Sequence, residues 1–238
     1  MTRRIPTARA WALCISVVLC TAASVWVGTG PAQAGSTVPP HDVVVVAGML
    51  ITRVTFDHWL RVAARGSASQ FRGAAVLIVP TDPPTFAGCI AQVRARIPNL
   101  ARVSTAQIRR DCRQLFTTLT RQVLDFLIKA DWYQEVAATD HIVITKSQVA
   151  HRLATDKRTQ FPTPAAYQRF LRRTGQTTRD IVFRVRIILI YQALIKTAHG
   201  DAHLLEQQVR KAFGPSTSCA RYYEMADCAG YRPGTAAA

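Results

Sequence analysis

The chain has 238 residues and a formal net charge of +16, from 30 basic and 14 acidic side chains. This length allows one sizeable hydrophobic core or two small ones. The positive charge predicts attraction to anionic polymers or surfaces, but it excludes no fold class.

Residues 1–34 have the composition of a secretory signal peptide. Three Arg and no acidic residue precede a hydrophobic region, Trp11 to Val27, and the segment ends in the small-x-small pattern Ala32-Gln33-Ala34. We therefore expect cleavage between Ala34 and Gly35 and an extracytoplasmic protein, either secreted or associated with the cell envelope. The alternative is a retained membrane anchor, because spanning helices need about 17 to 25 residues.

Four cysteines follow the expected cleavage site: Cys89, Cys112, Cys219 and Cys228. In an oxidising compartment an even set of cysteines usually forms disulfides. We predict the local pairs, Cys89 with Cys112 and Cys219 with Cys228. Zinc is the alternative, but no C-x-x-C or nearby His pair offers tetrahedral spacing.

Extended structure is predicted only near the start of the folded part. After a linker over residues 35–41, the β-branched run from Val43 to Thr52 predicts two short strands about a turn at Gly48. Apolar residues three or four apart then predict a helix over Thr55 to Ala64. The stretch from Gly66 to Pro84 reads as a linker, in which AAVLIV could form a strand with no assigned partner.

Helices are predicted over most of the remaining chain. Phe86 to Ile97 is a helix stopped by Pro98. The stretch Ser104-Thr-Ala-Gln107 is a capping box, in which the first side chain accepts from the first turn and the fourth reaches back. Behind it, an apolar face continues to about Ala138, so we expect a helix of more than thirty residues.

Three shorter helices follow, each with a start signal. The stretch Thr145-Lys-Ser-Gln148 is a second capping box. Thr163-Pro164 places an N-cap before a first-turn proline, and Gly175 ends that helix in the left-handed conformation. The stretch Thr177-Thr-Arg-Asp180 caps the last of the three. The fold class is therefore mainly α, with a short N-terminal β-hairpin.

The helix after Thr177 contains the densest apolar run outside the signal segment, IILIYQALI. Only Ile187 to Tyr191 lacks a polar residue, which is far shorter than a membrane span. The apolar residues occupy more than one helix face. Such a helix is either central to a bundle or faces both a core and a binding groove.

The order of these motifs carries a family resemblance. Val46 to Thr52, followed by Phe56, resembles the V-N-G-x-x-I-T-x-x-x-F opening of the SurA N-terminal domain, found in extracytoplasmic chaperones and PrsA-like foldases. Val123 to Ile128 with Trp132 resembles the long helix of that family. The stretch His141-Ile-Val-Ile-Thr145 resembles its G-I-x-V-S/T turn.

The resemblance continues through the F-L-x-x-x-G-x-T-x-x-D-L-x-x-x-I-R segment of the family, on Phe170 to Arg186, and covers roughly Val43 to Lys196. It implies a helical chaperone domain over residues 42–213, followed by a cysteine-containing tail over residues 214–238. Its strength lies in the ordered set, since each motif alone is weak.

The chain departs from the family pattern in two respects. Ala47 stands where the family usually has Asn, so the tight turn loses its best left-handed residue. Many relatives have a parvulin-type prolyl isomerase domain before their closing helix, whereas here only Thr197 to Asp201 precede HLLEQQVRKAF. The chain therefore resembles the chaperone part of such proteins without the enzyme.

We predict no catalytic residue, metal ligand or cofactor. His199 and His203 have helical spacing for a metal, but Gly200 weakens that helix and no Glu completes a zinc-protease motif. Asp57 and His58 read as a solvated pair in a first turn. The sequence contains no G-x-S-x-G, phosphate-binding loop or nucleophile with an assignable base.

Basic side chains cluster in two places, as Arg109, Arg110 and Arg113, and as Arg169, Arg172 and Arg173. Aromatic residues are not interleaved with them, and export separates the protein from nucleic acid. We expect solvated faces, with attraction to anionic envelope polymers or acidic clients as a secondary effect.

The resemblance implies an ATP-independent holdase that buries side chains of unfolded or translocating polypeptides in an apolar helical cradle. The residues that we expect to touch clients are Trp59, Phe126, Trp132, Tyr167, Phe170, Phe183, Ile187 and Tyr191. A prolyl isomerase, by family association, and a disulfide-stapled structural module of the envelope are the alternatives. A homodimer is also compatible with a cradle that a partner completes.

Overall fold

The computed structural model describes residues 37–68, 79, 83–100 and 102–232. The chain divides into two units, Met1–Ala34 and Gly35–Ala238, and all described residues belong to the second. The predicted signal segment lies outside the described residues, as does most of the stretch that contains AAVLIV. No helix within the described ranges is long and apolar enough to cross a membrane.

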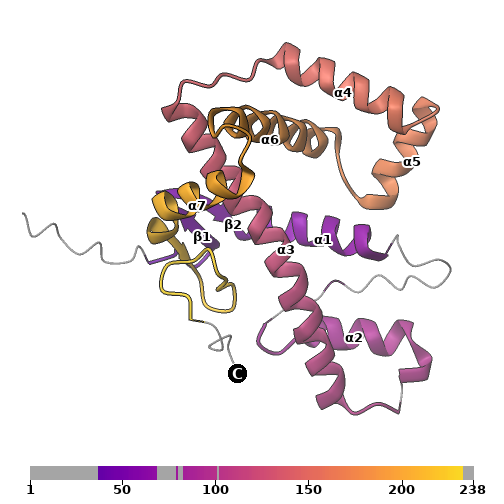
Figure 1. Cartoon of the computed structure of the whole chain (residues 1–238). Helices are drawn as coiled ribbons and strands as arrows, with labels where there is room; N and C mark the ends of the chain where they lie inside the picture. Colours follow the sequence, from indigo (N-terminus) through magenta and orange to yellow (C-terminus); the bar gives the residue numbers. More distant parts are fainter. Residues whose placement is uncertain (1–36, 69–78, 80–82, 101, 233–238) are drawn as a thin grey trace, which may run out of the picture. The chain divides into compact units, whose positions relative to one another are not determined.

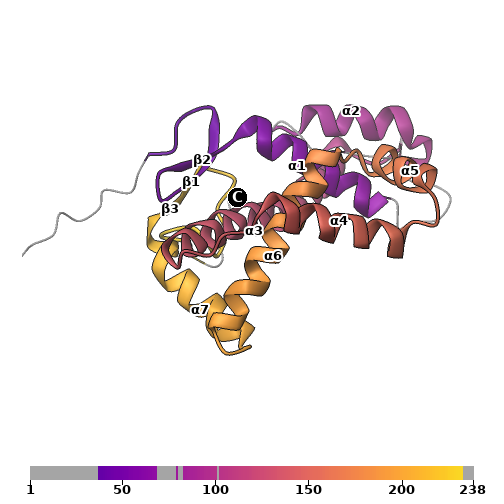
Figure 2. The same ribbon diagram turned by 90° about the horizontal axis from the view of Figure 1, so that it is seen from above.

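Three short strands form one antiparallel sheet in the order β2-β1-β3. Figure 1 labels β1 and β2, and Figure 2 labels all three strands. The strands β1 (Asp42–Val46) and β2 (Met49–Thr52) are the predicted hairpin, which the structure confirms. The strand β3 (Thr217–Cys219) was not expected. It pairs with the other side of β1, so all residues of β1 are buried and the C-terminal tail closes the sheet.

The hairpin turn requires left-handed backbone at two residues. Ala47 has φ 47° and Gly48 has φ 91°, which is the pattern of a tight turn between twisted strands. Glycine adopts positive φ freely, whereas a Cβ is strained there. Ala47 is therefore poorly suited to the conformation that this turn requires.

Seven α-helices within the described ranges make the fold mainly α, as predicted. They are α1 (Arg53–Ala68), α2 (Ala87–Arg96), α3 (Thr105–Thr139), α4 (Lys146–Gln160), α5 (Pro164–Thr174), α6 (Thr178–Thr197) and α7 (Ala202–Phe213). Short 3₁₀ turns follow α2 at Pro98–Leu100 and α7 at Gly214–Ser216. The long predicted helix is α3, with 35 residues.

The structure confirms the N-cap residues that were predicted for three helices. Thr145 and Thr177 form complete capping boxes with Gln148 and Asp180. Ser104 accepts from the backbone N–H of Gln107. The Gln107 side chain donates to Asp111 instead of returning to the cap, so the third predicted box is only half formed.

Helix α1 begins earlier and ends later than the apolar pattern predicted. The Thr52 hydroxyl, at the end of β2, accepts from the backbone N–H of Thr55, which satisfies a first-turn donor and lets the helix begin directly after the strand. The predicted span, Thr55 to Ala64, was therefore too short at both ends.

The long helix α3 is the centre of the unit. It contacts α1, α2, α6, α7 and β1 (Figure 2). Its Trp132 is fully buried, and the Nε1–H donates to Thr217 Oγ1 of β3 at 3.0 Å. Because Trp132 lies on the central helix and Thr217 in the tail, this bond joins two segments that are distant in sequence.

Two disulfides lie among the described residues and have the predicted pairing. Cys89–Cys112 joins α2 to α3. Cys219–Cys228 closes the tail on itself beyond β3. Such bonds are typical of oxidising, extracytoplasmic compartments, which agrees with the expected export.

Candidate functional site

A hollow with aromatic walls lies between α1, α3 and α6 and is the best candidate for a binding site. We call it the aromatic hollow. Its volume is about 640 Å³ when its open mouth is included. The residues that line it are Trp59, Val62, Ala63, Gly66, Gln122, Val123, Phe126, Gln176 and Arg184.

Three aromatic rings from three helices meet beside this hollow. Trp59 lies 5.1 Å from Phe126 and 6.1 Å from Phe183, measured between ring centroids, and the two Phe rings are 5.8 Å apart. Trp59 is buried, whereas Phe126 and Phe183 are half-buried. Partly exposed rings that are held by their neighbours can bury an incoming apolar side chain at little cost in conformational freedom.

A single cation covers two of these rings. The guanidinium carbon of Arg184 lies 5.1 Å from the centroid of Trp59 and 5.2 Å from that of Phe126. Part of the Arg184 side chain remains exposed, but burial of its head lowers the pKa of the guanidinium, while the charge of Asp180 opposes this change. A partly desolvated cation beside aromatic rings suits carbonyl or carboxylate groups of a polypeptide.

The hollow also contains an acceptor without a donor. Gln176 Oε1 is buried and has no hydrogen-bond partner among the described residues. It lies in the α5–α6 loop, directly after Gly175, whose φ of 69° ends α5. A Cβ at Gly175 would lie 2.3 Å from the Arg65 guanidinium, so the glycine lets α1 approach this loop. This unpaired oxygen can accept from a backbone N–H of a bound segment.

A second hollow lies where the C-terminal ends of α3 and α6 meet α7. We call it the α7 groove. Its empty volume is about 880 Å³ with its open mouth, and its lining is mostly apolar. The lining residues are Val136, Asp140, Leu194, Thr197, Ala198, His199, Leu204, Leu205, Gln208, Val209 and Ala212. Leu204 is 40% exposed at its edge, so apolar surface is presented to solvent here as well.

The apolar run of α6 is only partly covered. Ile187, Ile190 and Leu194 are buried against the core. Ile188 is 42% exposed and Val182 is 38% exposed. The helix therefore packs into the core on one face and leaves apolar side chains accessible on another, which is the arrangement expected for a helix that faces both a core and a groove.

The eight predicted client residues do not form one continuous surface. Trp59, Phe126 and Phe183 come together at the aromatic hollow. Trp132 and Ile187 are core residues, and Tyr191 packs on Tyr133 with ring centroids 5.1 Å apart. Tyr167 and Phe170 instead pack around Phe161 near the start of α5, at 5.3 and 5.2 Å.

Two residues of the hollow were not singled out from the sequence as client-binding residues. Arg184 follows Phe183, but no spacing rule places its head over rings from α1 and α3. Gln176 stands between a helix-ending glycine and a capping threonine, and this position gives no sign that its side chain is buried.

No group of three or more metal-ligating side chains occurs within the described ranges. The structure places His199 after the end of α6, with φ 53°, and His203 in the first turn of α7. The two residues are therefore separated by a turn and do not share one helix face. A helical metal motif is absent at these positions.

Comparison with known proteins adds no assignment. A scan against models of protein families finds no match, and neither the search of curated proteins nor that of solved structures finds one.

Proposed function

We propose that the protein is an extracytoplasmic, ATP-independent holdase that binds unfolded or translocating polypeptides through the aromatic hollow. The observation that carries this proposal is the meeting of Trp59, Phe126 and Phe183, with the guanidinium of Arg184 over the first two rings. The resemblance to SurA N-terminal domains supports the same class of function.

The chemistry of the hollow suits a polypeptide better than a small polar metabolite. Its rings offer apolar area to a client side chain, Arg184 attracts backbone carbonyls, and the unpaired amide oxygen of Gln176 can accept from a backbone N–H. Such contacts are independent of sequence, because every residue has a backbone and many have apolar side chains. Binding is therefore weak for each site and broad in its choice of client.

The α7 groove offers a second contact along the same two central helices. Arg184 of the hollow and Thr197 of the groove are thirteen positions apart on α6, a span of about 20 Å at 1.5 Å per residue. Because thirteen positions also place the two residues on nearly opposite faces of α6, an extended client needs more than about six residues, the number that covers the axial rise alone. Two contacts on one client raise the overall affinity without making either contact strong.

Suppression of aggregation tests the proposal. The full oxidised chain should reduce aggregation of several chemically denatured test proteins. Ala63→Phe should abolish most of this effect, because Ala63 lines the hollow and a phenyl ring fills its space. The matched control is Ala150→Phe, at an exposed position of α4, which should behave as the wild type.

Two outcomes would contradict the proposal in different ways. If the wild type fails with every client, the chain is better described as a disulfide-stapled structural module of the envelope. If it succeeds and Ala63→Phe is equally active, clients bind at another surface. Thermal melting of both variants shows whether either substitution disturbs the fold.

Isomerase activity is the remaining alternative, and the connection after α6 bears on it. Helix α6 ends at Thr197 and α7 begins at Ala202, so the described chain passes directly to the closing helix at the position where relatives have their enzyme. We expect isomerisation of a proline peptide at the uncatalysed rate. A rate above that background would instead favour a prolyl isomerase.

A further inference from the structure

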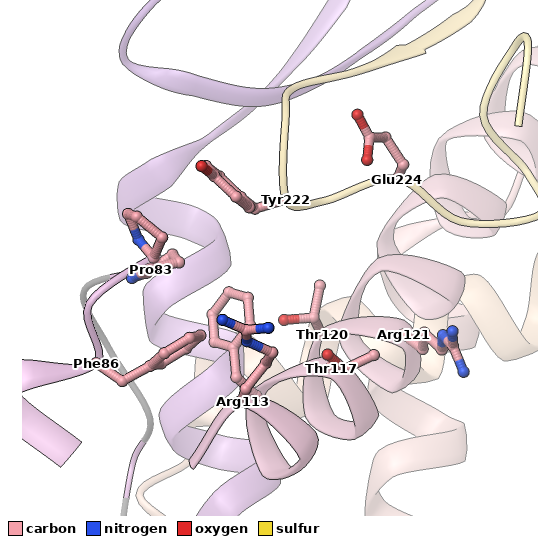
Figure 3. A pocket seen from close by; sticks show the side chains of 10 residues that line it. Pro83, Phe86, Arg113, Thr117, Thr120, Arg121, Tyr222 and Glu224 are labelled. Atoms are coloured by element: carbon pink, nitrogen blue, oxygen red, sulfur yellow. The ribbon is translucent and has the colours of Figure 1, made fainter. Parts of the chain in front are cut away.

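A third hollow lies on the other side of the unit and is formed by three segments that are distant in sequence. We call it the tail pocket (Figure 3). The loop before α2, the middle of α3 and the disulfide-closed tail enclose about 630 Å³ with the open mouth. Its lining residues are Pro83, Pro84, Phe86, Arg113, Phe116, Thr117, Thr120, Arg121, Tyr222 and Glu224.

The apolar wall of the tail pocket is rigidly packed. Phe86 and Phe116 are 3% and 4% exposed, and their rings meet edge to face with centroids 5.6 Å apart. On its far side, Phe116 packs against Tyr223 of the tail at 5.9 Å. A ligand therefore meets rings that are already in place, which reduces the entropy lost on binding.

Thr120 supplies a buried polar group that has no partner. Its side chain is 5% exposed, and its Oγ1 has no hydrogen bond among the described residues. Helical threonines can donate to the carbonyl four residues earlier. Thr118, Thr139 and Thr159 do so, each at 3.0 Å. Thr120 lines the pocket instead, and its hydroxyl is free to donate to a ligand.

Positively charged side chains also line this pocket. In Figure 3 the Thr120 hydroxyl points toward the guanidinium of Arg113, two turns earlier on α3, whereas that of Arg121 lies at the other end of the pocket. Arg113 and a hydroxyl donor together suit a carboxylate. Glu224 faces the pocket from the tail, and its negative charge disfavours a ligand with a second anionic group.

We propose that the tail pocket binds a monoanion in which a carboxylate is joined to an aromatic or branched apolar body. The carboxylate accepts from Thr120 and pairs with Arg113, and the apolar body lies against Phe86 and Phe116. A free carboxylic acid and the C-terminus of a polypeptide share this chemistry. The proposal is independent of the aromatic hollow, which is lined by different residues.

Calorimetry and ligand-observed NMR on the full oxidised chain test this site. The probes are 3-phenylpropionate, its uncharged amide, and a short peptide ending in phenylalanine with a free or an amidated C-terminus. We expect saturable binding of the carboxylates and at least about tenfold weaker binding of each amide, a difference of about 1.4 kcal/mol. Binding of the free-ended peptide alone would identify polypeptide ends as the ligand, and binding of the small acid would identify free acids.

Three variants locate the site. Thr120→Val keeps the shape of the side chain and removes the unpaired hydroxyl, so it should weaken binding about tenfold without lowering the melting temperature. Arg113→Gln should weaken carboxylate binding to a similar degree. Arg172→Gln, at an exposed arginine of α5 that does not line the pocket, is the matched control and should leave affinity nearly unchanged. Absence of saturable binding by both acids, or equal affinity in Thr120→Val and the wild type, would overturn the proposal.

Discussion

The Asp180 carboxylate caps α6 and contacts α1 through His58 at the same time. Its Oδ2 accepts from the backbone N–H of Thr177 at 2.6 Å, and its Oδ1 lies 3.0 Å from His58 Nε2. Asp180 is 8% exposed, so these contacts are shielded from water. One side chain therefore fixes both the start of α6 and its position beside α1, next to the aromatic hollow.

Asp180→Ala should lower the free energy of unfolding by about 2 kcal/mol, because a helix cap and a buried carboxylate contact are lost together. Urea denaturation measures the change. The control is Asp156→Ala on α4, where the carboxylate makes a more exposed pair with Arg152 at 2.9 Å. That substitution should cost about 0.5 kcal/mol or less. A loss at Asp180 no larger than that at Asp156 would show that neither the cap of α6 nor the contact with His58 contributes to stability.

The hydrogen bond between Trp132 and Thr217 leads to a second prediction. Thr217 Oγ1 accepts from the buried indole and donates to the Phe213 carbonyl at 2.9 Å. Thr217→Val keeps the volume but leaves both partners without a bond, which should cost about 1–3 kcal/mol in urea denaturation. Thr217→Ser retains the hydroxyl and should lose much less. If Thr217→Val and Thr217→Ser lower the free energy of unfolding equally, packing alone holds the tail on α3.

Local features of the sequence predicted the fold best. Thr145, Thr177 and Gly175 each act within one helix turn of their own position, and the structure confirms all three. The strand β3 has only three residues, and its pairing with β1 joins the two ends of the folded unit. No periodicity reveals such a pairing, because it depends on the path of the chain through seven intervening helices of the described unit.

The candidate sites, like the pairing of β3, could not be predicted from local sequence patterns. Aromatic side chains could be recognised as binding candidates, but their exposure depends on the packing of whole helices. Trp132 and Trp59 look alike in sequence, yet one is a core residue with a satisfied indole and the other lines a hollow. Thr120 and Gln176 each have a buried side-chain oxygen with no hydrogen-bond partner among the described residues. This can be recognised only once the positions of all neighbouring donors and acceptors are known.

The hairpin turn gives a third prediction. Ala47→Asn should raise the free energy of unfolding by about 0.5–1 kcal/mol, because Asn tolerates the left-handed conformation better than Ala. Thermal melting measures the change. Ala150→Asn, in the exposed middle of α4, is the control and should lower stability by about 0.5 kcal/mol through poorer helix propensity. A decrease in both variants would show that the turn is not strained.

The carboxyl group of Asp131 gives a fourth prediction, which concerns pH. Burial on α3, helped by the negative charge of Glu135 one turn later, raises the pKa of Asp131 from 3.8 to about 6. In the unfolded chain the carboxyl loses its proton near pH 4, while the folded chain retains it. Stability therefore falls as pH rises from about 4 to about 6 and is constant, for this group, above that range.

Asp131→Asn removes this titration. Relative to the wild type, the variant should gain about 1–2 kcal/mol between pH 4 and pH 7, a discounted value for a shift of about two pKa units in a half-buried group. Urea denaturation at several pH values measures the difference. Glu135→Gln should produce a smaller gain over the same range, because it removes the repulsion but leaves the carboxyl buried. If the wild type and Asp131→Asn follow parallel curves, the carboxyl is solvated in the folded protein and its ionisation costs the fold nothing.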